Sequence, residues 1–490
     1  MTAMEPTATR IPVPADFPIA WEQPGDENLF FTMDRMHWPS VITSLDDSVI
    51  KILIHTGWWR AAEAFAMPMR LHARRINGYH YGAMVPLPLP PPELAALAER
   101  SAERLQTAAG SLGRDWHESY LPEIKRLIAE TAGADFRARR LPELARDLDD
   151  AIARAGRETE IHFRIAFPMI VAQSLFDEFY RDIFAEPDAL NALRLLQGLD
   201  NLTVRLGRDL WQLSRDARRS PEVLQVIQQA EPGAVAGMLQ QSEAGRRFMR
   251  QLHGWLEIYG HRGDGLGISS TSWIEDPTPV VLMLREYVAR TDYDPNAEQA
   301  RLAAAREEAI AAARARLAGY PEAVVGQFEA LLTAAQDATV ISEDHDYWID
   351  FRGLHELRRV VVAIGARLAE AGSLADQNEV VYLTLAEAGV AARDPQGRDW
   401  SALVSRRAAE LAHFATLTPP PAIGTPPPGP PPDDPLVRGM GKFFGWHQPE
   451  APEPGLLKGV GGSKGTATGT VKVIHTLDEA HKLQPGDILV

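Results

Sequence analysis

The residues of this chain best suited to chemistry lie together in the segment Tyr259-Gly-His-Arg-Gly-Asp264. Arg262 could pair through two N–H groups with the oxygens of a phosphoryl group or a carboxylate. His261 could take a proton from a substrate hydroxyl as a general base near neutral pH, with Asp264 orienting its ring. The same three side chains could instead satisfy one another or the backbone in a buried structural loop. We predict these three residues as candidate catalytic groups, with the structural interpretation left open.

The elements around this segment are predicted to be two helices. An apolar and aromatic helix should end at Tyr259-Gly260, because glycine suits a helix C-cap. A hydroxyl run, Ser269–Ser272, follows it. A second helix is expected to begin at Glu275-Asp276-Pro277, because proline is accepted in a first helical turn.

A second cluster of polar and aromatic residues is Glu343-Asp-His-Asp-Tyr-Trp-Ile-Asp350, which is predicted to begin a helix. The spacing of His345 and Asp350 could bind a divalent metal, but no second pair of ligands is evident. Helix-start capping or substrate contact is the favoured interpretation, and no metal site is predicted. His162, on a long apolar helix, is interpreted as a core histidine whose ring nitrogens are satisfied by its neighbours.

The order of the elements predicts a mainly α-helical protein with a small β-rich N-terminal part. Residues 1–90 read as mixed segments, with a hairpin turn at Asn77-Gly78. Residues 91–416 read as helical because apolar residues recur at three- and four-residue spacing. Within them, a long helix is predicted from about Leu141 into Asp182, with a buried middle that contains Pro168.

Aromatic residues are concentrated in the first hundred positions. They are compatible with a planar acceptor such as a phenol, or equally with a packed core. The residues concerned are Trp21, Trp38, Trp58, Trp59, Tyr79 and Tyr81.

Two further regions close the chain. Residues 417–453 begin with LTPPPAIGTPPPGPPPDDP, and repeated prolines predict a semi-rigid spacer that cannot join a packed core. Residues 454–490 combine a glycine-rich run, Gly459–Gly465, with a predicted strand at Val471–Ile474 and a second strand opening at Ile488. This last region therefore reads as the start of a small, incomplete α/β domain.

Composition narrows the function classes. The 490 residues carry a formal net charge of −16, which argues against a nucleic-acid partner because phosphate neutralisation needs clustered Lys and Arg. The absence of cysteine excludes thiol catalysis and disulfides. No secretory signal and no bilayer-spanning apolar run is visible, so we expect a soluble, cytoplasmic protein without a membrane partner. Phosphate-binding-loop, serine-hydrolase and zinc-protease signatures are also missing.

Several of these motifs resemble the phosphoenolpyruvate-utilising enzymes. The glycine run and the ending Pro485-Gly-Asp-Ile-Leu-Val490 resemble the start of their swivelling phosphohistidine domain. The Tyr259–Asp264 segment with its Trp-x-Glu-Asp-Pro continuation is similar to the substrate domain of rifampicin phosphotransferases, although Gly265-Leu-Gly267 stands where many relatives have an acidic residue. The histidine-bearing subunit of phenylphosphate synthase is the other near resemblance.

The resemblance implies a helical substrate domain joined by the proline-rich spacer to a carrier domain whose phosphorylated histidine lies outside this sequence. The chain would move a phosphoryl group to the hydroxyl of a small acceptor, with a phenol as one candidate, and would be inactive alone. No cofactor is expected in the chain itself, whereas ATP and Mg²⁺ are implied on an ATP-grasp partner. The resemblance also implies these substrate-pocket residues: Tyr259, Trp273, Glu275, His345, Tyr347 and Asp350.

Two other interpretations remain open. A degenerate family member would bind a small molecule or a partner without transferring phosphate. A helical scaffold without a ligand would lack a concave site around Tyr259–Asp264.

Overall fold

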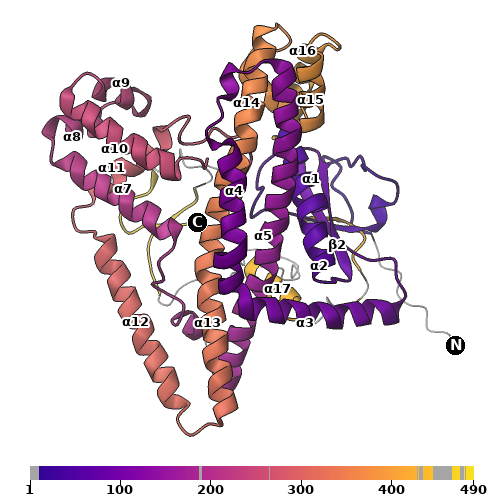
Figure 1. Ribbon diagram of the computed structural model, residues 1–490, viewed down its shortest axis with the longest axis vertical. Helices are drawn as coiled ribbons and strands as arrows, with labels where there is room; N and C mark the ends of the chain where they lie inside the picture. The colour runs from indigo at the N-terminus through magenta and orange to yellow at the C-terminus, as the bar shows by residue number, and fades with distance from the viewer. Residues whose placement is uncertain are drawn as a thin grey trace.

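The computed structural model describes residues 10–186, 190–263, 265–427, 429, 434–444, 466–474, 479 and 482–490. Over these residues the chain is mainly helical, with a small antiparallel sheet near its N-terminus (Figure 1). The predicted mainly helical fold class is therefore confirmed. The predicted domain boundaries stay predictions. No helix within the described ranges is both long and apolar enough to cross a membrane.

The described elements fall into strands, α-helices and short turns of 3-10 or π type. The strands are β1 (Phe30–Met33), β2 (Met69–Ile76), β3 (Tyr79–Pro86), β4 (Ala422–Gly424), β5 (Val471–Lys472) and β6 (Ile488–Leu489). The α-helices are α1 (Ser44–Ile52), α2 (Trp59–Ala64), α3 (Pro91–Asp115), α4 (Leu121–Ala132), α5 (Leu141–Ile183), α6 (Leu190–Leu193), α7 (Leu202–Arg218), α8 (Pro221–Gln229), α9 (Val235–Leu239), α10 (Glu243–Tyr259), α11 (Thr278–Ala289), α12 (Pro295–Arg316), α13 (Glu322–His345), α14 (Leu354–Glu370), α15 (Leu385–Arg393), α16 (Trp400–Phe414) and α17 (Pro435–Phe444). The short turns are η1 (Asp26–Asn28), η2 (Leu53–Trp58), η3 (Trp116–Tyr120), η4 (Phe136–Ala138), η5 (Pro232–Ala234), η6 (Asp346–Gly353) and η7 (Gln377–Tyr382).

The N-terminal sheet has the strand order β2-β3-β1-β4 and is antiparallel throughout. Its hairpin pairs Ile76 with Tyr79 across Asn77-Gly78, and both turn residues have positive φ angles of 47° and 80°. This is the left-handed turn that Asn-Gly favours between two strands. The predicted hairpin is confirmed.

The N-terminal aromatic residues pack into cores. Trp58, Tyr79 and Tyr81 are buried, and Trp21, Trp38 and Trp59 pack partly buried against the same clusters. Of the two interpretations of these aromatics, the structure favours a packed core.

The proline-rich region departs from its prediction at residues 417–424. Strand β4 pairs with β1, and its residue Ile423 is fully buried. The hydroxyl groups of Tyr79 and Tyr81 donate to the carbonyl oxygens of Leu417 and Pro420, at 3.0 and 2.8 Å. Proline removes backbone donors but keeps its carbonyl acceptor, so tyrosine side chains can fasten such a segment to a core. The expectation that this whole region cannot join a core is therefore wrong for these residues.

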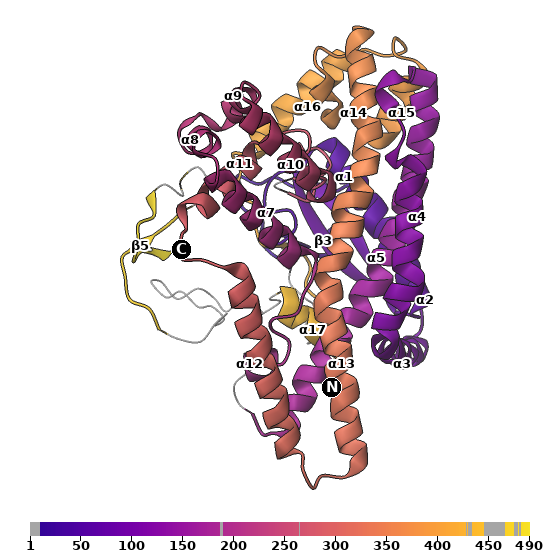
Figure 2. The ribbon, with the colours of Figure 1, turned by 60° about the vertical axis from the view of Figure 1, so that its left-hand side comes forward.

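Helix α5 is central to the fold, and α13 and α14 lie beside it and stack end to end (Figures 1 and 2). Its bounds, Leu141–Ile183, match the predicted long helix, and its apolar middle is buried with Pro168 inside it. The turn η2 approaches α5 so closely that a Cβ on Gly57 would lie 2.7 Å from Thr159. This contact joins the N-terminal part to α5.

Helices α7 to α11 form a separate lobe, seen at the upper left of Figure 1, with a hydrophobic core of its own. Within this lobe, α9 ends at Leu239 and α10 begins at Glu243. Ser242 starts the new helix, because its hydroxyl accepts the N–H of Gly245 at 3.0 Å.

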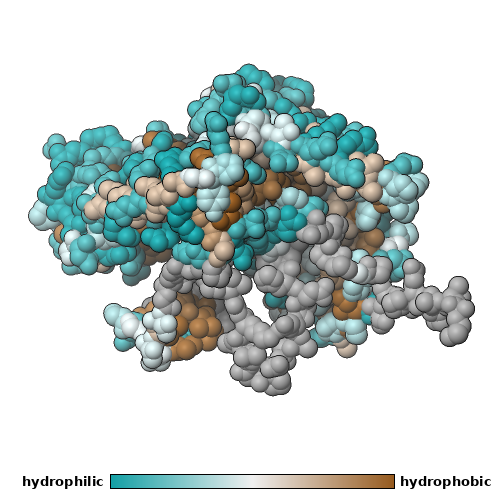
Figure 3. Space-filling view, turned by 90° about the horizontal axis from the view of Figure 1, so that it is seen from below, coloured by the Kyte–Doolittle hydropathy of each residue, from teal (hydrophilic) through white to brown (hydrophobic). Residues whose placement is uncertain are grey.

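Two C-terminal pieces lie within the described residues. Helix α17 packs on α5, where Arg438 pairs with both carboxylate oxygens of Glu178 at 2.9 and 3.0 Å. Strands β5 and β6 pair in parallel, so short strands occur in both predicted places. The glycine-rich run Gly459–Gly465 lies outside the described residues. Seen from below, the surface is mostly hydrophilic, with hydrophobic residues near its middle and in a cluster at the lower left (Figure 3).

Candidate functional site

The loop after α10 turns back on itself and is closed by backbone hydrogen bonds. The N–H groups of Trp273 and Ile274 donate to the carbonyl oxygens of Arg262 and Gly260, each at 2.8 Å. Gly260 has a negative φ, and a Cβ there would lie 2.6 Å from the Leu256 carbonyl oxygen. Glycine is therefore needed here because of close approach, rather than for a left-handed cap.

Arg262 lies between two aromatic rings. Its guanidinium carbon is 5.2 Å from the ring centre of Trp273 and 4.2 Å from that of Phe351. Its Nε is buried and has no hydrogen-bond partner among the described residues. Burial lowers the pKa of Arg262, while the charges of Asp346 and Glu343 oppose that shift. The result is a cation held in place by aromatic packing with a donor left unused.

His261 is engaged by another arginine. Arg352 Nη1 contacts both ring nitrogens of His261 and lies 2.8 Å from Nδ1, and the His355 ring lies 4.9 Å away. Guanidinium groups only donate, so the imidazole must accept and stay neutral. Burial and the Arg352 charge lower the pKa of His261 to about 2. The role of His261 as a base near neutral pH stays a prediction, and in this structure Arg352 occupies the lone pair that such a base needs. Asp264 lies outside the described residues.

The other predicted residues of this loop have their polar atoms occupied within the protein. The Tyr259 hydroxyl donates to Asp209 Oδ2 at 2.8 Å, and that of Tyr347 donates to the Ile258 carbonyl oxygen at 2.6 Å. Glu275 Oε2 accepts from Arg358 Nε at 2.8 Å and also from Ser272. Burial would raise the pKa of Glu275, but the Arg358 and Ser272 hydrogen bonds lower it overall. These polar atoms therefore bind other parts of the protein, and the role of these side chains in a substrate pocket stays a prediction.

The segment Glu343–Asp350 does not begin a helix, which corrects the prediction. Helix α13 runs through to His345 and continues through η6 into α14 as one column. The wider turn of η6 keeps Asp346 and Asp350 on the same side. The structure brings them to His345 and also to His162 of α5, and the ligand atoms of all four lie within 4.8 Å of one another. No feature of the sequence indicated that His162 would join this group.

The carboxyl groups of Asp346 and Asp350 differ in protonation. Burial and the neighbouring Asp350 raise the pKa of Asp346 well above its usual range. Burial opposes ionisation of Asp350 too, but His162 holds the pKa of Asp350 below its usual range. Burial and His162 lower the pKa of His345 to about 4, so His345 is neutral at pH 7.

A histidine–aspartate pair that sequence reasoning had given no role lies near this group. His37 Nδ1 is 2.8 Å from Asp34 Oδ2, and Asp34 Oδ1 accepts the backbone N–H of His37 at 3.0 Å. Burial opposes the charge, but the hydrogen bond to Asp34 and its charge raise the pKa of His37. The three-residue spacing of Asp34 and His37 was the available signal.

Electrostatic effects join these parts into one region. The charge of Asp350 helps to raise the pKa of His37, and the charge of Asp346 acts on Arg262. Asp346 and Asp350 also interact with each other. The candidate site is therefore the region around these carboxylates, with Arg262 and the His37–Asp34 pair at its sides.

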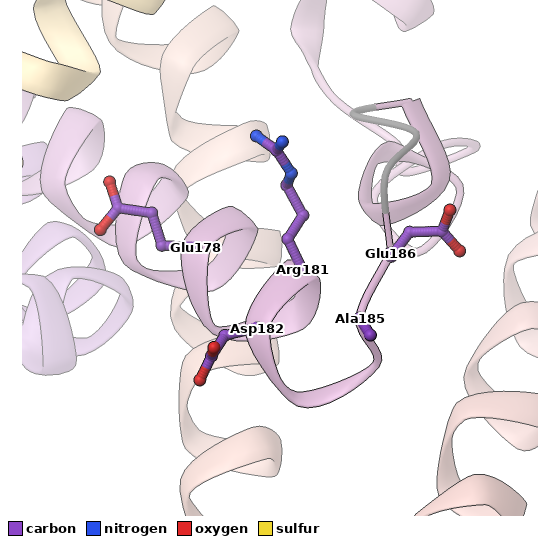
Figure 4. Close-up of a pocket in the computed structure, with 5 residues that line it drawn as sticks. All are labelled: Glu178, Arg181, Asp182, Ala185 and Glu186. Atoms are coloured by element: carbon purple, nitrogen blue, oxygen red, sulfur yellow. The ribbon is translucent and has the colours of Figure 1, made fainter.

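A surface depression elsewhere does not bring its polar side chains together in this way. It lies at the end of α5, and the side chains of Glu178, Arg181, Asp182 and Glu186 point in different directions (Figure 4). Glu178 is already paired with Arg438. None of the predicted site residues lines this depression.

Comparisons with known proteins find relatives over part or nearly all of the chain. Residues 162–343 match the rifampicin phosphotransferase fourth domain. Chondramide synthase cmdD of Chondromyces crocatus is 35% identical over 99% of this chain and 13% of its own length. An uncharacterized phosphotransferase of Bacillus subtilis, YvkC, is 25% identical over 68% of this chain and 39% of its own length. Rifampicin phosphotransferase of the same organism is 23% identical over 59% and 32%.

These matches define the class. The chain is a relative of the phosphoenolpyruvate-utilising enzymes. Within them it is rifampicin phosphotransferase-like, and its helical part carries the matched domain. It spans only 13% to 39% of the length of the three relatives named above. The closer likeness to phenylphosphate synthase stays a prediction.

Proposed function

We propose that this chain is the acceptor-binding part of a phosphotransferase. It would hold a small hydroxyl compound, with a phenol as one candidate, while a carrier histidine outside this sequence delivers a phosphoryl group. ATP and Mg²⁺ would act on an ATP-grasp partner that charges the carrier. The relatives named as phosphotransferases support this proposal.

The observation that carries the proposal is the state of Arg262. A buried donor left unused on a guanidinium is costly unless an anion completes it. The planar fork of arginine matches the oxygens of a phosphoryl group, and the flanking rings of Trp273 and Phe351 hold it in a fixed orientation. Phosphoryl transfer depends mainly on such positioning and charge stabilisation.

The proton of the acceptor hydroxyl needs a base, and His37 suits this role better than His261. The pKa of His37 is raised rather than lowered, and Asp34 fixes the orientation of its ring. Its side chain is 36% exposed, so an acceptor can reach it. Arg352, in contrast, occupies the lone pair of His261.

The test combines this chain with the swivelling and ATP-grasp parts of its natural protein or complex, ATP and Mg²⁺. Phosphohistidine and phosphorylated product are measured separately, with phenols and rifampicin as acceptors. Arg262→Gln should slow product formation by about a hundredfold, the scale of one lost charge-stabilising group, and leave carrier phosphorylation unchanged. Arg290→Gln is the matched control, since Arg290 also stacks on a tyrosine ring but lies outside the site. Wild-type product formation by the Arg262 variant would contradict the proposal.

A second candidate is a binding module without transfer. It is favoured by the relative that matches 99% of this chain, because that protein is named a synthase rather than a phosphotransferase. Under this alternative, the acceptor panel binds in an Arg262-dependent way but no phosphorylated product forms while the carrier is charged.

A further inference from the structure

A group of four side chains beside Arg262 has the composition of a metal site. His162 comes from α5, whereas His345, Asp346 and Asp350 come from the junction of α13 and η6. Their two imidazoles and two carboxylates offer four ligand atoms within 4.8 Å of one another. Only contacts between elements far apart in the sequence bring this set together.

The tautomer of His345 is fixed by its backbone contact. Its Nδ1 lies 2.8 Å from the Ile341 carbonyl oxygen, which can only accept, so Nδ1 carries the hydrogen. Nε2 therefore presents its lone pair, and it lies 3.2 Å from Asp346 Oδ1. A histidine that donates one ring N–H to a carbonyl and offers the other nitrogen is the usual arrangement of a metal ligand.

His162 also directs a ring nitrogen at this group. Its Nδ1 is buried and makes no hydrogen bond among the described residues, although Asp350 Oδ2 lies 3.2 Å away. The His162 and His345 rings lie side by side, with centres 4.9 Å apart. Two ring nitrogens and two carboxylates thus face one another where α5 meets the junction of α13 and η6.

We propose that His162, His345, Asp346 and Asp350 bind a divalent transition-metal ion, with Zn²⁺ as the type. Two imidazoles with two carboxylates suit zinc, cobalt or manganese, whereas Mg²⁺ and Ca²⁺ prefer oxygen ligands alone. Zinc bonds of about 2.0–2.1 Å place tetrahedral ligands about 3.3 Å apart, so the widest pair must close by about 1.5 Å. The Asp346 side chain is 45% exposed and provides the way in.

The ion would connect α5 to the α13–η6 junction. It would also change the electrostatic surroundings of Arg262, because Asp346 interacts with Arg262. The proposal does not rest on the proposed phosphoryl transfer, because metal binding is measured without any reaction.

The experiment uses the full chain after chelation of all metal. Zn²⁺ is added at increasing concentration, and bound metal, the melting temperature and Co²⁺ absorption in the visible range are measured. We expect one ion per chain, a zinc-dependent rise in melting temperature, and the absorption of four-coordinate Co²⁺. His162→Ala, Asp346→Asn and Asp350→Asn should each weaken Zn²⁺ affinity at least tenfold.

The control is His253→Ala, because His253 and Glu257 form an exposed histidine–carboxylate pair on α10 with a separation of 3.4 Å. This variant should bind Zn²⁺ like the wild type. If a buried-ligand variant fails to fold by circular dichroism, Asp346→Asn carries the test, since its side chain is partly exposed. Absence of stoichiometric Zn²⁺ binding, unchanged binding in the folded ligand variants, or equal affinity for Mg²⁺ would overturn the proposal.

Discussion

The guanidinium of Arg352 lies against the imidazole of His261, with Nη1 2.8 Å from Nδ1. This contact joins the η6 turn to the loop after α10 and decides the protonation of the most conspicuous histidine in the sequence. A histidine that accepts from an arginine cannot also accept a substrate proton. His37 is therefore a better candidate for the base than His261.

The first prediction concerns the pKa of His261. Arg352→Gln removes the adjacent positive charge, so the pKa of His261 should rise from its value of about 2. Histidine ring resonances followed by NMR against pH would measure this shift. Arg114→Gln, at an exposed arginine paired with Asp115, is the control and should leave the His261 titration unchanged. An unaltered His261 titration in the Arg352 variant would show that burial alone sets this pKa.

The second prediction concerns the pH dependence of phosphoryl transfer. His37 must be unprotonated to act as a base, so transfer should fall as pH drops through its raised pKa. Asp34→Asn removes the partner that raises this pKa, and the acidic limb should move to lower pH. His37→Asn should lower kcat by about 10² to 10⁴, the usual contribution of general base catalysis. An acidic limb that stays in place in the Asp34 variant would exclude His37 as its source.

The third prediction concerns stability. Burial raises the pKa of Glu158 to about 8, whereas an unfolded glutamate titrates near 4.5. The folded state therefore holds this proton more tightly, and stability is lost as pH rises from about 4.5 to 8. Glu158→Gln cannot ionise, so it should gain stability over the wild type by roughly 1.4 kcal/mol per pH unit within that window. Urea unfolding at several pH values measures this gain.

Glu123→Gln provides the opposite case. Arg157 pairs with both oxygens of Glu123 at 2.8 and 2.9 Å and lowers the pKa of Glu123. The Glu123–Arg157 ion pair stabilises the folded state above pH 4.5, and this stabilisation is lost in acid. Glu123→Gln should therefore be less stable than the wild type near neutral pH. If both variants change stability in the same direction at pH 8, the burial of Glu158 is not the cause.

The fourth prediction tests whether the proline-rich region belongs to the fold. Ile423 of β4 is fully buried, so Ile423→Ala should destabilise the protein by about 2–5 kcal/mol in denaturant unfolding. Ile258→Ala removes the same atoms from a half-exposed position and should cost much less. Equal small effects of the two variants would mean that β4 separates from the sheet in solution.

Local features of the sequence predicted local structure well. The bounds of α5, the Asn77-Gly78 hairpin and the end of α10 at Tyr259 followed from signals within a few neighbouring residues. Helical periodicity, left-handed turn residues and helix ends are properties of a short stretch of backbone. Arg262 was likewise singled out by its neighbours in the chain.

Tertiary structure alone decided which of these residues act together. The pairing of β4 with β1, the contact of Arg352 with His261, and the meeting of His162 with Asp346 and Asp350 all join distant segments. Such contacts depend on which helix faces pack against each other and on the exact approach of two elements, and no short stretch of sequence encodes either. The sequence by itself thus determined the class of protein and its elements, whereas packing determined the chemistry available to each histidine.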